Sequence, residues 1–227
     1  MNFSNRFVSE CREYSSYVQH VKAPVFRKSF VLKEGSQSGE ILICGLGFYD
    51  LFINGEKITK GYLAPYISNT DHIVYYDHYD LTPWLKAGEN VIGVMLGDGF
   101  QNSKTRVWDF MDNVFNSAPK LALSMKVESD GEKQEFDAMD FSCKKGPIFF
   151  NDLRSGVFFD KREEEKGWDQ PGFQEDENWH KPILADRPRG KAKLCEAEPI
   201  AVVEERKPVK IWKGALADYT PRGDVPE

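Results

Sequence analysis

Hydrophobic and polar residues alternate along much of the chain with the two-residue period of β-strands. In PVFRKSFVL, residues 24–32, Phe26 and Phe30 share one face and the other face is mixed. Because alternate side chains of a strand point to opposite sides, one face of this segment is expected to enter a core. The segments 39–47 and 89–100 are more continuously apolar and predict deeply buried strands. Further strands are predicted in HIVYYDHYDL, in both halves of PKLALSMKVESDGEKQEFDA, in GPIFFND and in GVFFDKRE.

Two dipeptides predict tight hairpin turns between these strands. Asn54-Gly55 follows the apolar run YDLFI, and Asp130-Gly131 separates the two halves of the segment 119–138. Such pairs favour a type I′ turn, because its two central residues need positive φ, which Asn, Asp and Gly tolerate. Asn54 also has a second interpretation, in which its side-chain amide binds a ligand.

The pattern as a whole predicts an all-β fold, an antiparallel β-sandwich of the jelly-roll kind. Many short strands separated by Gly, Pro, Asn and Asp indicate this architecture, and helix is expected only as single turns near LTPWLK and EDENWHK. Residues 1–22 read as an irregular or weakly helical lead-in, and residues 23–203 as the sandwich. The proline-containing residues 204–227 read as a linker toward a further domain, so the chain is expected to be part of a longer polypeptide.

Composition narrows the classes of partner. The net charge of −6 and the pI near 5.4 argue against nucleic acid and anionic membranes, since phosphate binding needs a basic face. No run approaches the roughly 20 apolar residues of a membrane span, and the amino terminus has no signal-peptide pattern. The compartment is left open, cytoplasmic or exported. The four cysteines lie far apart, without zinc spacing, and are expected to be small buried side chains.

Asp and Asn residues cluster in two neighbouring segments that are candidates for binding. Carboxylate and amide oxygens are ligands that calcium and sugar hydroxyls accept, and an adjacent aromatic ring can cover the apolar face of a sugar. The carbohydrate-binding candidates are Asp98, Asn102, Trp108, Asp109 and Asn54, and the calcium candidates are Asp109, Asp112 and Asn113. The spacing does not match an EF-hand loop, and ordinary turn chemistry is the competing explanation.

Other chemistry finds little support in the sequence. The four histidines are scattered, and no Ser-His or Cys-His arrangement, phosphate-binding loop or dinucleotide-binding motif is present. The acidic segment KREEEKGWDQPGFQEDENW, residues 161–179, is expected to form a solvated surface whose aromatic residues pin it onto the domain.

A long block, residues 46–100, closely resembles the amino-terminal β-sandwich of bacterial α-L-rhamnosidases. The features that carry the resemblance are Gly47-x-Tyr49, Ile53-Asn54-Gly55, Leu63-x-Pro65, the run Tyr75 to Thr82, Gly88-x-Asn90 and Leu96-Gly97-Asp98-Gly99. A second block, residues 151–182, is similar to another segment of that family. It departs from the family pattern at Val157, where Glu is common, and at Lys161, where Ala is common, so a polar role of that Glu is in doubt here.

The resemblance implies a non-catalytic domain. In such rhamnosidases the acid and base carboxylates lie in a later (α/α)₆ barrel, which this chain does not reach, so no residue here is expected to be catalytic and the chain alone is expected to be inactive. The implied partners are that C-terminal catalytic domain and a rhamnose-containing glycan. Related sandwich modules bind L-rhamnose through calcium, which makes calcium the implied cofactor.

Three rival functions remain open at the level of sequence. The chain could be a calcium-assisted rhamnose-binding module, a structural module that packs against the catalytic domain, or a self-contained hydrolase. A structural module should carry an exposed apolar patch, and a uniformly polar surface would argue against it.

Overall fold

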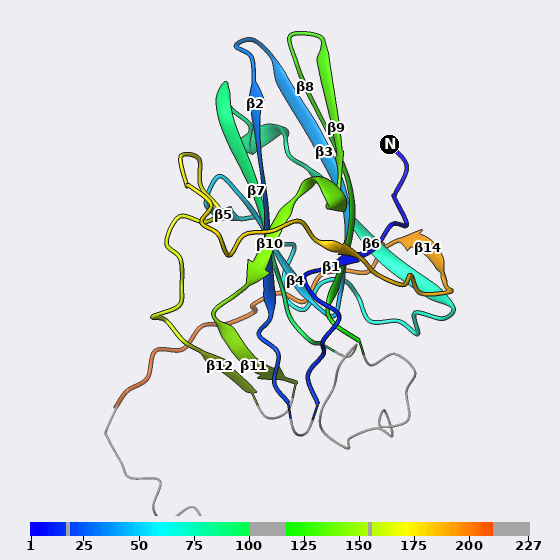
Figure 1. Ribbon diagram of the computed structural model, residues 1–227, viewed down its shortest axis with the longest axis vertical. Helices are drawn as coiled ribbons and strands as arrows, with labels where there is room; N and C mark the ends of the chain where they lie inside the picture. Colours follow the sequence, from blue (N-terminus) through cyan, green and yellow to red (C-terminus); the bar gives the residue numbers. More distant parts are fainter. Residues whose placement is uncertain (17–18, 100–116, 154–155, 211–227) are drawn as a thin grey trace, which may run out of the picture.

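The computed structural model describes residues 1–16, 19–99, 117–153 and 156–210. Two β-sheets pack face to face, and a separate two-stranded hairpin lies at the lower end of the molecule (Figure 1). The predicted all-β sandwich is therefore confirmed. In the described part of the chain, helical structure is limited to short 3₁₀ turns such as Thr82–Trp84 and Ala138–Asp140, and no helix is long and apolar enough to cross a membrane.

The larger sheet has the strand order β13-β1-β8-β3-β6-β14, and β9 also pairs with β8. Its strands are β1 (Val8–Ser9), β3 (Gln37–Leu46), β6 (Ile73–Asp80), β8 (Lys120–Ser129), β9 (Glu132–Asp137), β13 (Ile183–Leu184) and β14 (Lys191–Leu194). Neighbours pair antiparallel, except that β14 runs parallel to β6.

The smaller sheet has the order β10-β2-β7-β4-β5, and all its pairs are antiparallel. Its strands are β2 (Pro24–Leu32), β4 (Tyr49–Ile53), β5 (Glu56–Lys57), β7 (Gly88–Leu96) and β10 (Ser142–Lys145). The separate hairpin consists of β11 (Ile148–Asp152) and β12 (Gly156–Phe159). The predicted turn in LTPWLK is the 3₁₀ turn at Thr82–Trp84, whereas the segment EDENWHK forms no helix.

The core lies between the two sheets and follows the predicted alternation. From β2, Phe26 and Phe30 point inward and meet Ile41 and Ile43 of β3 in one cluster of buried side chains. Burying a side chain of this size stabilises a fold by about 1.5–3 kcal/mol, so the apolar face of each strand fixes which side turns inward. Lys28 lies on the same face of β2, and its ammonium group sits 4.9 Å from the ring centre of Phe136.

The outer face of the smaller sheet is covered by the acidic segment 161–179. Trp168 and Trp179 pack on Val25, in a second apolar cluster. The Nε of the buried Arg27 donates a hydrogen bond of 2.8 Å to the backbone oxygen of Trp168, and its Nη1 lies 2.7 Å from Glu175. The expectation that aromatic residues pin this segment is confirmed.

The amino-terminal residues pack on part of the outer face of the larger sheet. Phe7 packs in a buried cluster with Cys44 of β3 and Ala122 of β8. Residues 1–22, expected as an irregular or weakly helical lead-in, thus contribute strand β1 and a buried aromatic ring. Cys44 and Cys143 are buried as expected, and Cys11 and Cys195 are partly exposed.

One edge of the sandwich is closed by residues 180–184. His180 bridges Cys143 at the edge strand of the smaller sheet, and β13 then pairs with β1 of the larger sheet. This segment joins the edges of the two sheets and places β1, β13 and the beginning of β8 side by side.

Candidate functional site

Of the residues predicted to contact sugar or calcium, Asn54 and Asp98 lie in the described part of the chain. The remaining candidates lie outside the described residues: Asn102, Trp108, Asp109, Asp112 and Asn113. Within the described ranges, no group of three or more His, Cys, Asp or Glu side chains is arranged to hold a metal ion. A calcium site at the other residues stays a prediction.

Asp98 lies at the end of β7, in the predicted Gly-Asp-Gly loop. It is almost fully buried, and its backbone N–H donates a hydrogen bond of 2.7 Å to the side-chain oxygen of Asn151 in β11. A Cβ atom on Gly47 would lie 2.1 Å from the backbone oxygen of Asp98, so only glycine fits there. The Asp98 loop, the corner after β3 and the hairpin β11–β12 therefore meet at one end of the sandwich.

Asn54 occupies the predicted turn, and its side chain is engaged within the fold. It has φ of 50°, and Gly55 has φ of 87°, as a type I′ turn requires. Its Nδ2 donates 3.0 Å hydrogen bonds to the backbone oxygen of Trp84 and to Oδ1 of Asn90, and its Oδ1 accepts one of 2.9 Å from the N–H of Val91. These bonds use both amide donors, so a ligand would meet little remaining capacity.

The hairpin β11–β12 carries a cluster of exposed apolar side chains, here called the hairpin surface. Its members are between 41% and 61% exposed: Phe149, Leu153, Val157, Phe158 and Phe159. In Figure 1 the hairpin projects from the lower end of the sandwich, where the described part of the tail, up to residue 210, also runs. All residues of β12 are exposed, so both faces of this strand meet solvent.

Sequence reasoning missed the hairpin surface because apolar strand patterns are typical of burial. One signal was available in the sequence. The runs IFF and VFF place apolar side chains on both faces of their strands, and a two-stranded hairpin cannot bury both faces by itself. Phe158 contacts two rings, with centroids 5.9 Å from Phe149 and 5.2 Å from Phe150. Val157, which is 61% exposed, enlarges the apolar area.

A buried polar network links the two sheets at the motif that contains Tyr49. The Tyr49 hydroxyl donates a hydrogen bond of 2.5 Å to Oδ2 of Asp77 and lies 2.9 Å from the hydroxyl of Tyr79. Burial raises the pKa of Asp77 above its ordinary value, and burial also raises the pKa of Tyr79 to about 12. Since Tyr49 comes from β4 and its partners from β6, the network ties the sheets together.

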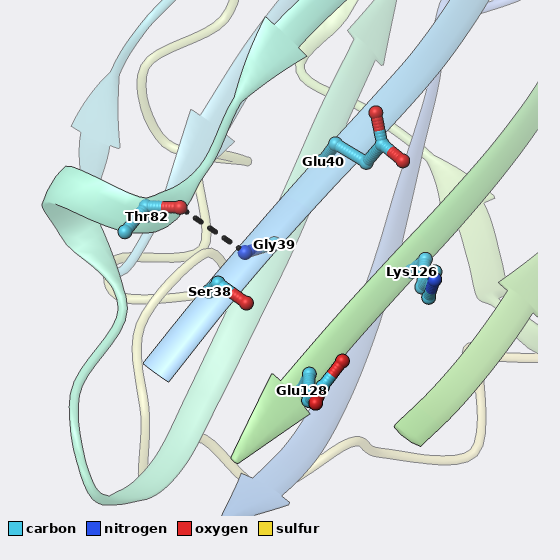
Figure 2. Close-up of a pocket in the computed structure, with 6 residues that line it drawn as sticks. All are labelled: Ser38, Gly39, Glu40, Thr82, Lys126 and Glu128. Atoms are coloured by element: carbon cyan, nitrogen blue, oxygen red, sulfur yellow. Dashed lines mark hydrogen bonds between the residues drawn. The ribbon is translucent and has the colours of Figure 1, made fainter. Parts of the chain in front are cut away.

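A shallow pocket of about 220 Å³ lies on the outer face of the larger sheet, where β3 and β8 run beside Thr82 (Figure 2). It is lined by Ser38 and Glu40 of β3, by Lys126 and Glu128 of β8 and by Thr82, whose Oγ accepts a hydrogen bond of 3.2 Å from Gly39. Nε2 of His78 lies 3.1 Å from Oε2 of Glu40, and the two side chains form an ion pair when the imidazole is protonated. The charged side chains of the lining are two carboxylates and one ammonium group, and the pocket is here called the acidic pocket. Outside the lining, the amino terminus of Met1 lies 3.7 Å from Glu40, and Lys133 lies 3.9 Å from Glu128.

The chain is similar to known α-L-rhamnosidases over most of its length. The family model described as the α-L-rhamnosidase N-terminal domain matches residues 36–204. An α-L-rhamnosidase of Formosa agariphila is 30% identical over 205 residues, which are 87% of this chain and 21% of that protein. One from Streptomyces avermitilis is 30% identical over 136 residues, 59% of this chain and 13% of that protein.

Solved structures give the same result. The α-L-rhamnosidase from Dictyoglumus thermophilum superposes with a TM-score of 0.78 at 31% identity, covering 93% of this chain and 24% of that one. The Streptomyces avermitilis enzyme complexed with L-rhamnose gives 0.64 at 26% identity, covering 80% and 17%. The chain thus spans less than a quarter of each of these relatives. It belongs to the α-L-rhamnosidase N-terminal domain family.

Proposed function

We propose that this chain is the non-catalytic β-sandwich of an α-L-rhamnosidase and that its hairpin surface packs against the catalytic part of the same polypeptide. Such an enzyme hydrolyses terminal α-L-rhamnosyl groups with carboxylates supplied by that other part. The hairpin surface carries the proposal. Exposed apolar clusters are found on domain and subunit interfaces, and the relatives provide a much longer polypeptide to cover one.

The energetics favour packing as the role of this end of the molecule. The three phenylalanine rings of the hairpin surface are about half exposed, so covering one of them would contribute about half of the value for full burial, roughly 1 kcal/mol. The hairpin is attached to the sandwich through the hydrogen bond from Asp98 to Asn151 and through the pairing of Ala23 with Ile148. These two hydrogen bonds join the hairpin to the loop after β7 and to the residue before β2.

The test compares Phe158→Ser in this chain alone and in the complete rhamnosidase polypeptide. We expect the smaller change in the chain alone, where Phe158 is 55% exposed and only its contacts with the rings of Phe149 and Phe150 are lost. In the complete polypeptide we expect a further loss of roughly 1 kcal/mol, in the stability of the domain contact, because about half of the Phe158 side chain is left for that contact to cover. The measurement is thermal unfolding with differential scanning calorimetry, with residual hydrolysis of a chromogenic α-L-rhamnoside as the second readout.

The matched control is Val31→Ser, which removes an apolar side chain that is also exposed but lies on β2, away from the hairpin. It should leave both polypeptides unchanged. Equal effects of Phe158→Ser in both polypeptides would contradict interdomain packing. Turnover of the rhamnoside by this chain alone would contradict the non-catalytic role.

A second candidate function is calcium-assisted binding of L-rhamnose. It is favoured by the position of Asp98, which the fold places at the same end as the hairpin, directly before the segment that holds the other predicted ligands. Titration calorimetry of the chain with L-rhamnose should then show saturable heat with calcium and none with a chelator. Asp109→Asn should abolish that heat, and Asp130→Asn, in the distant β8–β9 turn, should not. Absence of heat at millimolar sugar in both conditions would contradict this function.

A further inference from the structure

A second pocket on the larger sheet lies where β1, β13 and the beginning of β8 meet. Its volume is about 250 Å³, and its lining includes Ser9, Arg12, Ser117, Lys120 and Asp186. It lies near the other end of β8 from the acidic pocket of Figure 2. Its charged side chains are two cations and one carboxylate, the reverse of the acidic pocket.

The two cations of this pocket have unused donors. Lys120 is partly buried, and its Nζ donates one hydrogen bond of 2.9 Å, to the backbone oxygen of Asp186. Burial lowers the pKa of Lys120, because the ammonium group is partly removed from water, and the nearby Asp186 offsets this only in part. Arg12 is exposed and forms no ion pair or hydrogen bond with the rest of the described chain.

Neutral hydrogen-bonding groups also line the pocket, beside the apolar residues Ala118, Leu184 and Ala185. The Oγ of Ser117 is buried and has no hydrogen-bond partner among the described residues. Ser9 is almost fully buried beside it in the wall of the pocket. Cys11 also lines the pocket, and burial raises the pKa of its thiol to about 12, so it adds no negative charge at neutral pH. A hydroxyl without a partner in such a place is a donor for an acceptor that enters from outside.

We propose that this pocket binds an oxyanion, a carboxylate or phosphate group of a small molecule, between Lys120, Arg12 and the hydroxyl of Ser117. An ammonium and a guanidinium group form their strongest hydrogen bonds with such anions, and a lone serine hydroxyl supplies a further donor. The volume suits one charged group with a small carrier, such as a uronic acid, rather than an oligosaccharide. This site goes beyond the proposed function and does not depend on it.

The test titrates the isotope-labelled chain with three probes and follows amide chemical shifts. D-Glucuronate presents a carboxylate on a sugar, inorganic phosphate presents a phosphate alone, and L-rhamnose is the neutral sugar control. We expect saturable shifts at residues 9–12, 117–120 and 184–186 with at least one anion, weakened by added salt, and none there with L-rhamnose. Glucuronate binding alone would identify an acidic sugar as the ligand class, and phosphate binding alone a phosphate group.

The variants use a control on the same strand. Lys120→Met and Arg12→Gln should each weaken anion binding about tenfold, the effect of losing one charge-assisted hydrogen bond. Lys126→Met removes a positive charge from the same face of β8 but in the acidic pocket, and should leave binding unchanged. Because Arg12 is exposed, its variant keeps the test valid if Lys120→Met fails to fold.

Three results would overturn the proposal. They are the absence of saturable shifts with either anion at millimolar concentration, equal weakening by Lys126→Met, and binding of L-rhamnose at the same residues with similar affinity. The first would show that the pocket is only a gap in the surface. The second and third would show that local charge does not select the ligand.

Discussion

The two hairpin turns of the chain have the same backbone and different surroundings. Asn54-Gly55 has φ values of 50° and 87°, and Asp130-Gly131 has φ values of 49° and 78°. Both dipeptides join neighbouring antiparallel strands, β4 to β5 and β8 to β9. At the level of local chemistry they are equivalent, because both place residues that tolerate positive φ at the two central positions.

Their tertiary contacts distinguish them. The Asn54 side chain joins the turn to Trp84, Asn90 and Val91 through three hydrogen bonds, and Asn90 is fully buried. The Asp130 turn is exposed, and nothing lies within 4 Å of a Cβ built on Gly131. Two turns with the same backbone can therefore differ in role. The turn at Asp130 only reverses the chain, whereas the turn at Asn54 also joins distant segments through side-chain hydrogen bonds.

The largest effect is expected for Asn54→Gly. Glycine keeps the positive φ, so the turn and the fold should persist. Three hydrogen bonds are lost, however, and the N–H of the buried Val91 loses the acceptor that Asn54 provides. We expect the free energy of unfolding to fall by about 3–4 kcal/mol. Urea denaturation followed by tryptophan fluorescence measures this, and faster hydrogen exchange at the Val91 amide should accompany it. A loss below about 0.5 kcal/mol would show that these bonds add no stability.

Gly55→Ala should have the next largest effect. The φ of 87° strains any residue with a Cβ, at about 1–2 kcal/mol, and the new Cβ would lie 2.8 Å from Cγ of Gln170. We expect a total loss of about 2–3 kcal/mol, measured by denaturation. In a double-mutant cycle, Gln170→Ala should restore the part of the unfolding free energy that Gly55→Ala loses through the close contact with Gln170. An interaction energy of zero between the two changes would contradict the role of Gln170.

Gly131→Ala isolates the backbone strain, because the new Cβ meets open space. We expect a loss of about 1–2 kcal/mol, smaller than that of Gly55→Ala. The same denaturation experiment measures it. If the two alanine variants were equally destabilised, the packing beneath Gly55 would be irrelevant and the two turns would be energetically the same.

The smallest effect is expected for Asp130→Gly, the counterpart of Asn54→Gly. It makes the equivalent local change without tertiary hydrogen bonds to lose, so the change in unfolding free energy should stay within about 0.5 kcal/mol. A loss comparable to that of Asn54→Gly would erase the distinction between the turns. It would also show that glycine at this turn position is itself costly.

Long strands were well predicted from the sequence, and short edge strands were not. β2 coincides with the predicted segment PVFRKSFVL, because nine alternating residues carry a strong signal. β1 and β13 contain two residues each, too few to show a period. β14, with the sequence KAKL, is exposed throughout. It is defined by its parallel pairing with β6, a strand far away in the sequence, and not by an apolar pattern of its own.

The candidate sites depended even more on tertiary placement. Asp98 could be assigned to a loop from Gly97 and Gly99, but its contact with Asn151 links segments more than 50 residues apart. The hairpin surface could not be foreseen, because an apolar run alone does not tell a core strand from an exposed one. Likewise, Arg12 and Lys120 share a pocket because β1 and β8 are neighbours in the larger sheet.

The sequence by itself determined the strand period, the inward faces, both turns and the resemblance to the rhamnosidase family, because each is written in neighbouring residues. Only the tertiary structure decided that Asn54 is a junction and that the β11–β12 aromatic residues are exposed. It also decided that Lys120 faces a pocket. These properties depend on which distant segments come to lie beside a residue, and a period of two or a turn motif carries no information about that.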